Sequence, residues 1–244
     1  MMDSKKTSAL IFGRNDYSLK IVQNIVHKYP DVHIFELDED MIEKSDELYE
    51  VNSFDLSDDW EDFKSTYDMQ KSIAFCVLEN DAKNIFLTIS LRASFSDLTI
   101  IALSKNKESA NKLTMAGANK VIPLVQTTAD IIVEMLNKPI ITDVLHNILY
   151  ETSDLKIAQI KVENHSYFDG KYPSDVEWSK KHGVIVLSIM HEDMSTEFIY
   201  SSKAKHHAIK NGDIFIVVGY AKDIEEFEKL IGSRCDVDWS HRSR

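Results

Sequence analysis

The residues best placed to do chemistry form the segment Gly13-Arg14-Asn15-Asp16-Tyr17-Ser18, which follows a short apolar run at residues 9–12. A glycine turn between a strand and a helix is where Rossmann-type proteins hold a pyrophosphate, through the pattern Gly-x-Gly-x-x-Gly. This chain keeps only the first glycine and has Asn15 and Ser18 at the other two positions. Because the second glycine lets the backbone approach a pyrophosphate, the motif argues against a tightly bound NAD in the usual pose.

Charged residues surround this turn. Glu36 lies at the end of the next apolar run, about 20 residues beyond the turn, where an acidic side chain accepts the hydroxyls of a ribose. The alternative is a solvated acid at the end of a strand. Arg14, Lys105 and Lys107 would line the same crevice and favour an anion, or else they are ordinary surface charge.

Other chemistries have weaker support. His206 and His207, with His191 and Glu192 in the preceding hairpin, carry ligands that suit zinc or nickel. Adjacent residues on a strand point to opposite faces, so we do not expect both histidines to hold one ion. Spacing reveals no Ser-His-Asp or Cys-His set, although such sets are defined in space rather than in sequence.

Composition restricts the class of protein. The formal net charge of −12 disfavours nucleic acid as a partner, because that affinity rests on lysine and arginine. No apolar run approaches the roughly 20 residues needed to cross a bilayer, and the first residues lack the apolar region of a secretory signal. Two cysteines without metal or redox spacing suggest a reducing cytosol.

Strands and helices alternate through the first half and would position the glycine turn. Apolar runs predict strands at 9–12, 32–37, 50–52, 72–78, 98–103 and 120–122, with helices at 81–93 and 107–115 among the connections. We expect helix 81–93 to bury Ile85, Phe86, Ile89 and Leu91. This order predicts an α/β fold with a Rossmann-like, doubly wound parallel sheet, in which ligands bind beyond the carboxyl ends of the strands.

Two apolar helices follow, over residues 123–149, and Lys138-Pro139 separates them. The apolar stripe of the second is wider than a solvent-facing helix needs. We therefore expect it to pack against something outside its own domain. The alternative is an ordinary connector that is buried within its own subunit.

The last part is rich in strands. Residues 155–162 alternate as a half-buried strand does, 184–189 read as a strand covered on both faces, and Asn211-Gly212-Asp213 is a hairpin-type turn before a strand at 214–218. A helix is expected at 223–231. The predicted divisions are 1–122, 123–152, a small α+β lobe at 153–233, and a tail at 234–244.

The order of these parts resembles an RCK domain (regulator of potassium conductance), of the type that joins a TrkA-N to a TrkA-C domain. The resemblance rests on the degenerate turn IFGRNDYS, on LTMAGANKVIPL, which is similar to the family's MAGAD-x-VI-x-P motif, and on two segments of the last lobe. These are LKIAQIKVENHSYFDGKYPSDVEW and KNGDIFIVVGYAKDIEEFEKLI.

The resemblance implies a regulatory switch rather than an enzyme. Family members form homodimers through the helix-turn-helix crossover, here residues 123–149, and the dimers assemble into an octameric or tetrameric gating ring that controls a potassium-channel pore. The chain would then lie in the cytoplasm, at the inner face of the membrane. Two alternatives stay open: a soluble nucleotide-binding subunit of a potassium transporter, and an NAD-dependent oxidoreductase.

The resemblance also implies a degraded Rossmann site for an adenine nucleotide, ATP, ADP or NAD(H). Asp55 matches the aspartate that reaches the adenosine half. Calcium is not expected, since Val77, Leu103 and Lys105 stand at the positions of the calcium ligands and none of them binds a hard cation. The residues expected to line the nucleotide site are Gly13, Arg14, Asn15, Asp16, Tyr17, Ser18, Glu36, Asp55 and Lys105.

Overall fold

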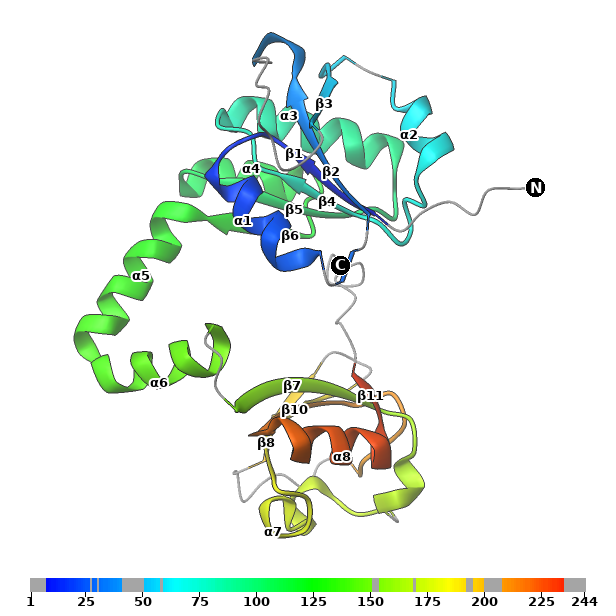
Figure 1. The fold of residues 1–244 in the computed structure, drawn as a ribbon, viewed down its shortest axis with the longest axis vertical. Helices are drawn as coiled ribbons and strands as arrows, with labels where there is room; N and C mark the ends of the chain where they lie inside the picture. The colour runs from blue at the N-terminus through cyan, green and yellow to red at the C-terminus, as the bar shows by residue number, and fades with distance from the viewer. Residues whose placement is uncertain are drawn as a thin grey trace. The chain divides into compact units, whose positions relative to one another are not determined.

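The computed structural model describes residues 8–26, 28–29, 31–40, 51–57, 59–150, 154–168, 170–191, 195–199 and 208–234. These residues divide into two compact units, one ending at Val133 and the other beginning at Glu134. Each unit has its own sheet (Figure 1). Each also has its own hydrophobic core.

The first unit contains a six-stranded sheet in which every neighbouring pair is parallel, in the order β3-β2-β1-β4-β5-β6. The strands are β1 (Ser8–Phe12), β2 (Asp31–Leu37), β3 (Val51–Phe54), β4 (Ile73–Cys76), β5 (Thr99–Ser104) and β6 (Lys120–Pro123). The order reverses between β1 and β4, so the carboxyl ends of these two strands flank the switch point of the sheet. The predicted doubly wound parallel sheet is confirmed.

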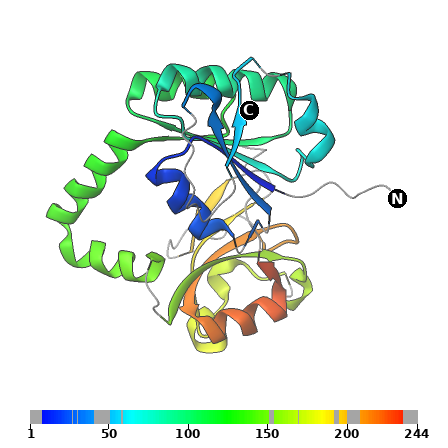
Figure 2. The same ribbon diagram turned by 45° about the horizontal axis from the view of Figure 1, so that its top comes forward.

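Helices cover both faces of this sheet. They are α1 (Asp16–Ile25), α2 (Glu61–Thr66), α3 (Asp81–Ser94) and α4 (Lys107–Met115). Figures 1 and 2 show α3 and α4 on one face and α1 on the other. Strand β1 is buried along its whole length, with Leu10 and Phe12 in the core beneath α3 and Ile11 in the core beneath α1. Such burial on both faces explains why this strand reads as a continuous apolar run.

The predicted inner face of α3 is partly wrong. Phe86 and Ile89 are 53% and 49% exposed, whereas the buried residues of this helix are Asn84, Leu87, Thr88 and Leu91. Two polar residues lie on the inner face because their hydrogen bonds are satisfied there, by backbone carbonyl groups. A prediction from the apolar residues alone therefore assigns the wrong face of this helix to the core.

Two consecutive helices, α5 (Leu124–Asn137) and α6 (Pro139–Tyr150), follow the sheet. As predicted, proline separates them: Pro139 is the first residue of α6, where its missing N–H group costs nothing. None of the side chains of α5 is buried. Among the described residues, no helix combines the length and the apolar character that a membrane span requires.

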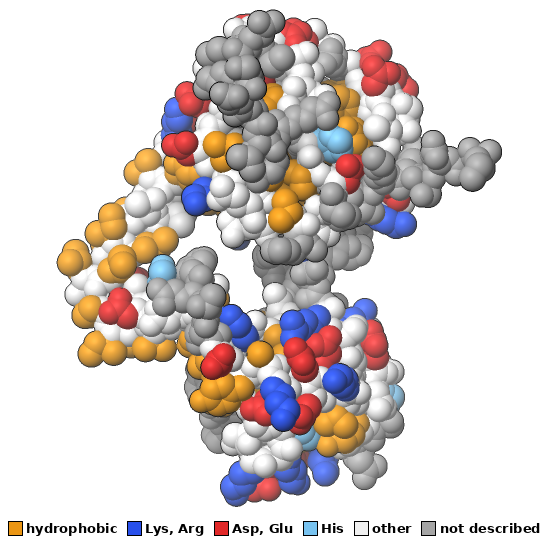
Figure 3. Space-filling view, in the orientation of Figure 1, with side chains coloured by type: hydrophobic (Ala, Val, Ile, Leu, Met, Phe, Trp, Pro, Cys, Tyr) orange, Lys and Arg blue, Asp and Glu red, His pale blue; other side chains and the backbone are white. Residues whose placement is uncertain are grey.

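Large apolar side chains crowd the surfaces of both helices (Figure 3). Eleven of them are each at least 46% exposed, a high value for residues of this type. They are Val125, Ile131, Ile132, Val133, Met135, Leu136, Ile140, Ile141, Val144, Leu145 and Leu149. A surface of this kind marks a site of interaction with another molecule or another copy.

The second unit holds a five-stranded antiparallel sheet in the order β11-β7-β10-β8-β9. Its elements are β7 (Leu155–Val162), α7 (Trp178–His182), β8 (Val184–Met190), β9 (Thr196–Phe198), β10 (Ile214–Tyr220), α8 (Ala221–Ile231) and β11 (Gly232–Arg234). Strand β8 was expected to be covered on both faces, and this is wrong: Ile185 and Leu187 are 57% and 41% exposed. The reason is that the apolar residues of α8, Ile224 and Phe227, pack in a core on the opposite face of the strand, with Val184 and Val186.

Candidate functional site

Two cavities lie at the carboxyl ends of the strands around the switch point of the first sheet. We call the first, of about 380 Å³, the Arg14 cavity; it is lined by Gly13, Arg14, Asn15, Glu36, Leu37, Leu78, Glu79, Asn80 and Lys83. The second, of about 290 Å³, is the Lys105 cavity, lined by Asn15, Asp16, Tyr17, Val77, Leu78, Glu79, Asp81, Leu103, Ser104, Lys105 and Leu124. Asn15, Leu78 and Glu79 line both, so the two cavities adjoin along these residues.

Asn15 makes the main polar contacts where the two cavities adjoin. Its Oδ1 atom accepts hydrogen bonds from the backbone N–H groups of Tyr17, at 3.0 Å, and Ser18, at 3.2 Å. The Ser18 hydroxyl accepts from the Asn15 N–H group at 2.9 Å, which completes a capping box at the start of α1. The Nδ2 atom of Asn15 donates to the carbonyl oxygen of Val77 at 2.7 Å. Asn15 therefore fastens α1 to the end of β4, across the switch point.

Gly13 makes this close approach possible. Its φ angle of +119° lies in the region that favours glycine. A Cβ atom at this position would lie 2.8 Å from the carbonyl carbon and oxygen of Val77, which is too close for any side chain. The first glycine of the motif is therefore needed by the backbone itself, whether or not a ligand binds.

Arg14 and Glu36, which both line the Arg14 cavity, form an ion pair. The Nη1 and Oε2 atoms are 3.0 Å apart, and the side chains are only 13% and 12% exposed. The sequence placed both residues in the crevice, but it did not predict that they pair. Sheet order explains the contact, because Arg14 follows β1 and Glu36 lies near the end of its neighbour β2.

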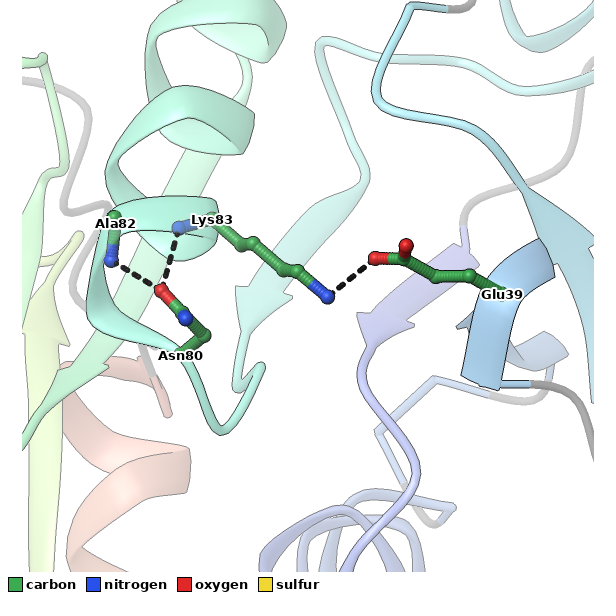
Figure 4. Close-up of polar contacts among 4 residues, drawn as sticks. All are labelled: Glu39, Asn80, Ala82 and Lys83. Atoms are coloured by element: carbon green, nitrogen blue, oxygen red, sulfur yellow. Dashed lines mark hydrogen bonds and ion pairs between the residues drawn. The ribbon is translucent and has the colours of Figure 1, made fainter.

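A second ion pair borders the same cavity (Figure 4). Asn80 caps α3 by accepting hydrogen bonds from the N–H groups of Ala82 and Lys83, at 2.9 and 3.2 Å. The Lys83 ammonium group contacts the carboxylate of Glu39, which follows β2. Lys83 was not predicted as a site residue. The signal that could have identified it is its position in the first turn of α3, because α3 follows β4, the strand across the switch point from β1.

Carboxylates dominate the Lys105 cavity, where Asp16, Glu79 and Asp81 face a single lysine. The Asp81 carboxylate accepts from the Lys105 N–H group, at 3.3 Å, and from Asn106 Nδ2, at 3.2 Å. The cations expected to favour an anion do not come together. Arg14 is paired with Glu36, Lys105 lies in the other cavity, and Lys107 lines neither.

The remaining predicted residues lie apart from the cavities. Ser18 is buried beneath the turn, where it holds the cap of α1. Asp55 lines neither cavity, and its carboxylate accepts from both the hydroxyl and the N–H group of Ser57. These two hydrogen bonds, the hydroxyl's first, hold the pKa of Asp55 below its ordinary value.

These contacts decide which parts of a dinucleotide fit the crevice. The Arg14 cavity offers what a nucleoside needs, with the apolar side chains of Leu37 and Leu78 beside the carboxylate of Glu36. The pyrophosphate does not fit. The N–H groups at the start of α1 that would bind it already donate to Asn15, and Asp16 adds a negative charge beside them.

Metal ligands do not converge in the described part of the chain, where no group of three or more His, Cys, Asp or Glu side chains could hold an ion. His191 lies between two carboxylates instead, with Nδ1 at 3.0 Å from Asp213 Oδ1 and Nε2 at 3.5 Å from Glu197 Oε2. Its expected companions, Glu192, His206 and His207, lie outside the described residues.

Two family patterns match the chain in sequence order. The TrkA-N domain matches residues 9–124, which contain the parallel sheet and the crevice. The TrkA-C domain matches residues 157–232, which contain the antiparallel sheet. Together the two matches cover most of the chain and leave between them α5 after its first residue and all of α6.

Relatives and a solved structure agree with these matches. Two proteins of Methanocaldococcus jannaschii are similar: "Probable potassium channel protein 2" is 27% identical over 174 residues, 69% of this chain and 49% of the relative. "Potassium channel protein 1" is 24% identical over 156 residues, 64% of this chain and 45% of the relative. The chain thus spans about half the length of the relatives it matches.

The fold of the human SLO3 gating ring is also similar, with a TM-score of 0.63 at 11% sequence identity, over 90% of this chain and 46% of that one. At this level of identity the likeness concerns the fold alone. The two domain matches, in this order and around a helix-turn-helix element, identify the family. The chain belongs to the RCK family, whose members join a TrkA-N domain to a TrkA-C domain.

Proposed function

We propose that this chain is the ligand-sensing, gating-ring part of a potassium channel and acts as a regulator rather than as an enzyme. The observation that carries the proposal is the uncovered apolar surface of α5 and α6, which stands between the two family domains. The names of the two methanogen relatives support a channel as the regulated partner.

The partner for this apolar surface is a second copy of the chain. The two consecutive helices carry eleven large apolar side chains that are each at least 46% exposed, and exposed apolar surface of this kind marks an interaction site. Residues 123–152 would form the dimerisation element between an N-lobe at 1–122 and a C-lobe at 153–233. Dimers built in this way assemble further into a ring of four or eight chains, in keeping with closed symmetry.

A ligand in the Arg14 cavity would be coupled to the ring through Asn15, Leu78 and Glu79, which also line the Lys105 cavity. Leu124, the first residue of α5, lines this cavity. A helix of 14 residues is about 21 Å long, so a small change in the cavity wall moves the far end of α5 by a larger distance. Ligand binding shifts the ring only as far as its affinities for two ring shapes differ.

The ligand class that the Arg14 cavity supports is an adenine nucleoside group. Its ribose hydroxyls would donate to Glu36, and its base would lie against Leu37 and Leu78. The start of α1 does not fit a pyrophosphate, so the proposed ligand is a single nucleoside group rather than a dinucleotide. The same mismatch gives no support to hydride transfer from NAD(H).

A soluble subunit of a potassium transporter is the nearest alternative, because it would use the same dimer and the same crevice. The relatives' names favour the channel. In the channel assembly the chain lies at the cytoplasmic face of the membrane, joined to its pore either covalently or by contact.

Rubidium flux tests this function. Two sets of liposomes are prepared, one with the pore domain that this chain regulates and one with the same pore together with this chain. The uptake of rubidium into the two sets is then compared. We expect the chain to change the flux at least severalfold, and the change to disappear with Ile140→Asp. Leu230→Asp, at an exposed leucine on α8 outside the two helices, is the control. Flux that is indifferent to the chain would contradict the proposal.

A further inference from the structure

We infer that the Asn15 side chain stands in for the phosphates of a ligand and divides the crevice, so that it admits a nucleoside-sized ligand and excludes a diphosphate. The inference rests on the proposed function in one respect, namely that the crevice is the ligand site. It goes further by naming the residue that sets the size and charge of the ligand.

The contacts of Asn15 are those that a bound phosphate would make. Its Oδ1 atom takes the N–H groups of Tyr17 and Ser18, which are the donors that a helix start offers to an anion. Its Nδ2 atom reaches Val77 on the other side of the switch point. A phosphate would have to displace all three hydrogen bonds and would then lie beside the carboxylate of Asp16.

The shape of the crevice agrees with the contacts. A dinucleotide places one nucleoside on each side of its pyrophosphate, which requires a continuous channel across the switch point. Here the crevice falls into two adjoining cavities of about 380 and 290 Å³, and Asn15 and Glu79 line both where they meet. Each cavity is near the lower end of the sizes found for small-ligand sites, so one nucleoside group suits either.

The backbone allows the channel to be reopened. Asn15 is in an extended conformation, with φ −158° and ψ −177°, which glycine adopts without strain. Replacing Asn15 by glycine removes the carboxamide and frees the two N–H groups. Replacing Ser18 as well removes the hydroxyl that holds the cap and restores the full Gly-x-Gly-x-x-Gly pattern.

Titration calorimetry with NADH, ADP and adenosine tests the inference on the complete chain. We expect the wild type to bind neither NADH nor ADP at millimolar concentration, and Asn15→Gly with Ser18→Gly to bind both at least tenfold more tightly. Each charge-assisted hydrogen bond to a freed N–H group is worth about a factor of ten or more. Asn106→Gly removes a comparable cap at the start of α4 and should gain nothing.

Two outcomes would overturn the inference. One is a wild type that binds NADH or ADP as tightly as the double variant does. The other is a double variant that binds neither, because then something other than Asn15 excludes the diphosphate. Asn15→Gly alone repeats the test if the double variant unfolds. These failures leave the regulatory role untouched, since rubidium flux tests that role. The wild type is expected to bind adenosine, and a wild type that does not bind it would count against the proposed ligand class.

Discussion

The wholly buried side chain of Asn84 donates a 3.0 Å hydrogen bond to the carbonyl oxygen of Leu103 and so joins α3 to β5. The same amide donates to Cys76, at 3.1 Å, and accepts from the N–H group of Leu78, at 3.0 Å. One side chain thus holds together α3 and the ends of β4 and β5 beside the cavities.

Replacing Asn84 with leucine should therefore be severely destabilising. Leucine has a similar volume but leaves three backbone groups unsatisfied, at a cost of about 3 kcal/mol or more in the free energy of unfolding. Urea denaturation measures the change. Asn24→Leu, an exposed asparagine on α1, is the control and should change stability by less than about 0.5 kcal/mol. Equal losses in both variants would show that the three contacts contribute little.

The Arg14–Glu36 pair should be strongly coupled. Arg14→Gln or Glu36→Gln alone leaves a charge in a site where both side chains are less than 15% exposed. We expect each to cost about 2 kcal/mol and the double variant to cost little more than either, which gives a coupling energy above about 1 kcal/mol. Urea denaturation of the four proteins completes the cycle.

An exposed pair provides the comparison for this cycle. Lys64 and Glu61 lie 2.6 Å apart, but their side chains are 43% and 67% exposed. Solvent screens such pairs, so the same glutamine substitutions should give a coupling energy below about 0.5 kcal/mol. If the two cycles give the same value, burial in the crevice does not strengthen the Arg14–Glu36 contact.

Acidification should weaken the second unit through His182. Burial against Trp178 and Phe227, and then the nearby Lys181, hold the pKa of His182 below its ordinary value of 6.5. The unfolded chain therefore binds the proton more readily. The contribution of His182 to stability is complete above pH 6.5 and is lost as the pH falls below it.

Urea denaturation across this range measures the effect. Between about pH 7.5 and pH 5, the unfolding free energy of the wild type should fall more steeply than that of His182→Gln, which carries no titrating group at this position. Ser179→Ala, at an exposed residue of α7 that carries no titrating group, should keep the wild-type slope. If the unfolding free energy of His182→Gln falls as steeply with pH as that of the wild type, the pH dependence arises from other groups and the prediction is wrong.

Much of the fold could be predicted because local pattern and burial agree. Strand β1 is covered on both faces and reads as an unbroken apolar run, and Pro139 marks the break between α5 and α6. The pattern failed where polar side chains face inward with their hydrogen bonds satisfied, as Asn84 does. It also failed where a sheet has helices on one face only, as at Leu187.

The crevice could be predicted only in part. Gly13 and Glu36 occupy positions that a sequence motif defines, but Lys83 enters the site because β4 lies next to β1, and no local pattern reveals that pairing. The contact of Asn15 with Val77 joins residues that are 62 positions apart. The fold, rather than the motif, therefore determines which N–H groups of α1 remain available to a ligand.

The most direct test of the central claim, that a second copy covers α5 and α6, is the mass of the complete chain in solution. Light scattering after size exclusion should give twice the mass of one chain, or an even multiple of it. Ile140→Asp with Leu145→Asp should give a folded monomer, because it places charges in the apolar surface. A wild type that stays monomeric at micromolar concentration, or a double variant that keeps the wild-type mass, would contradict the account.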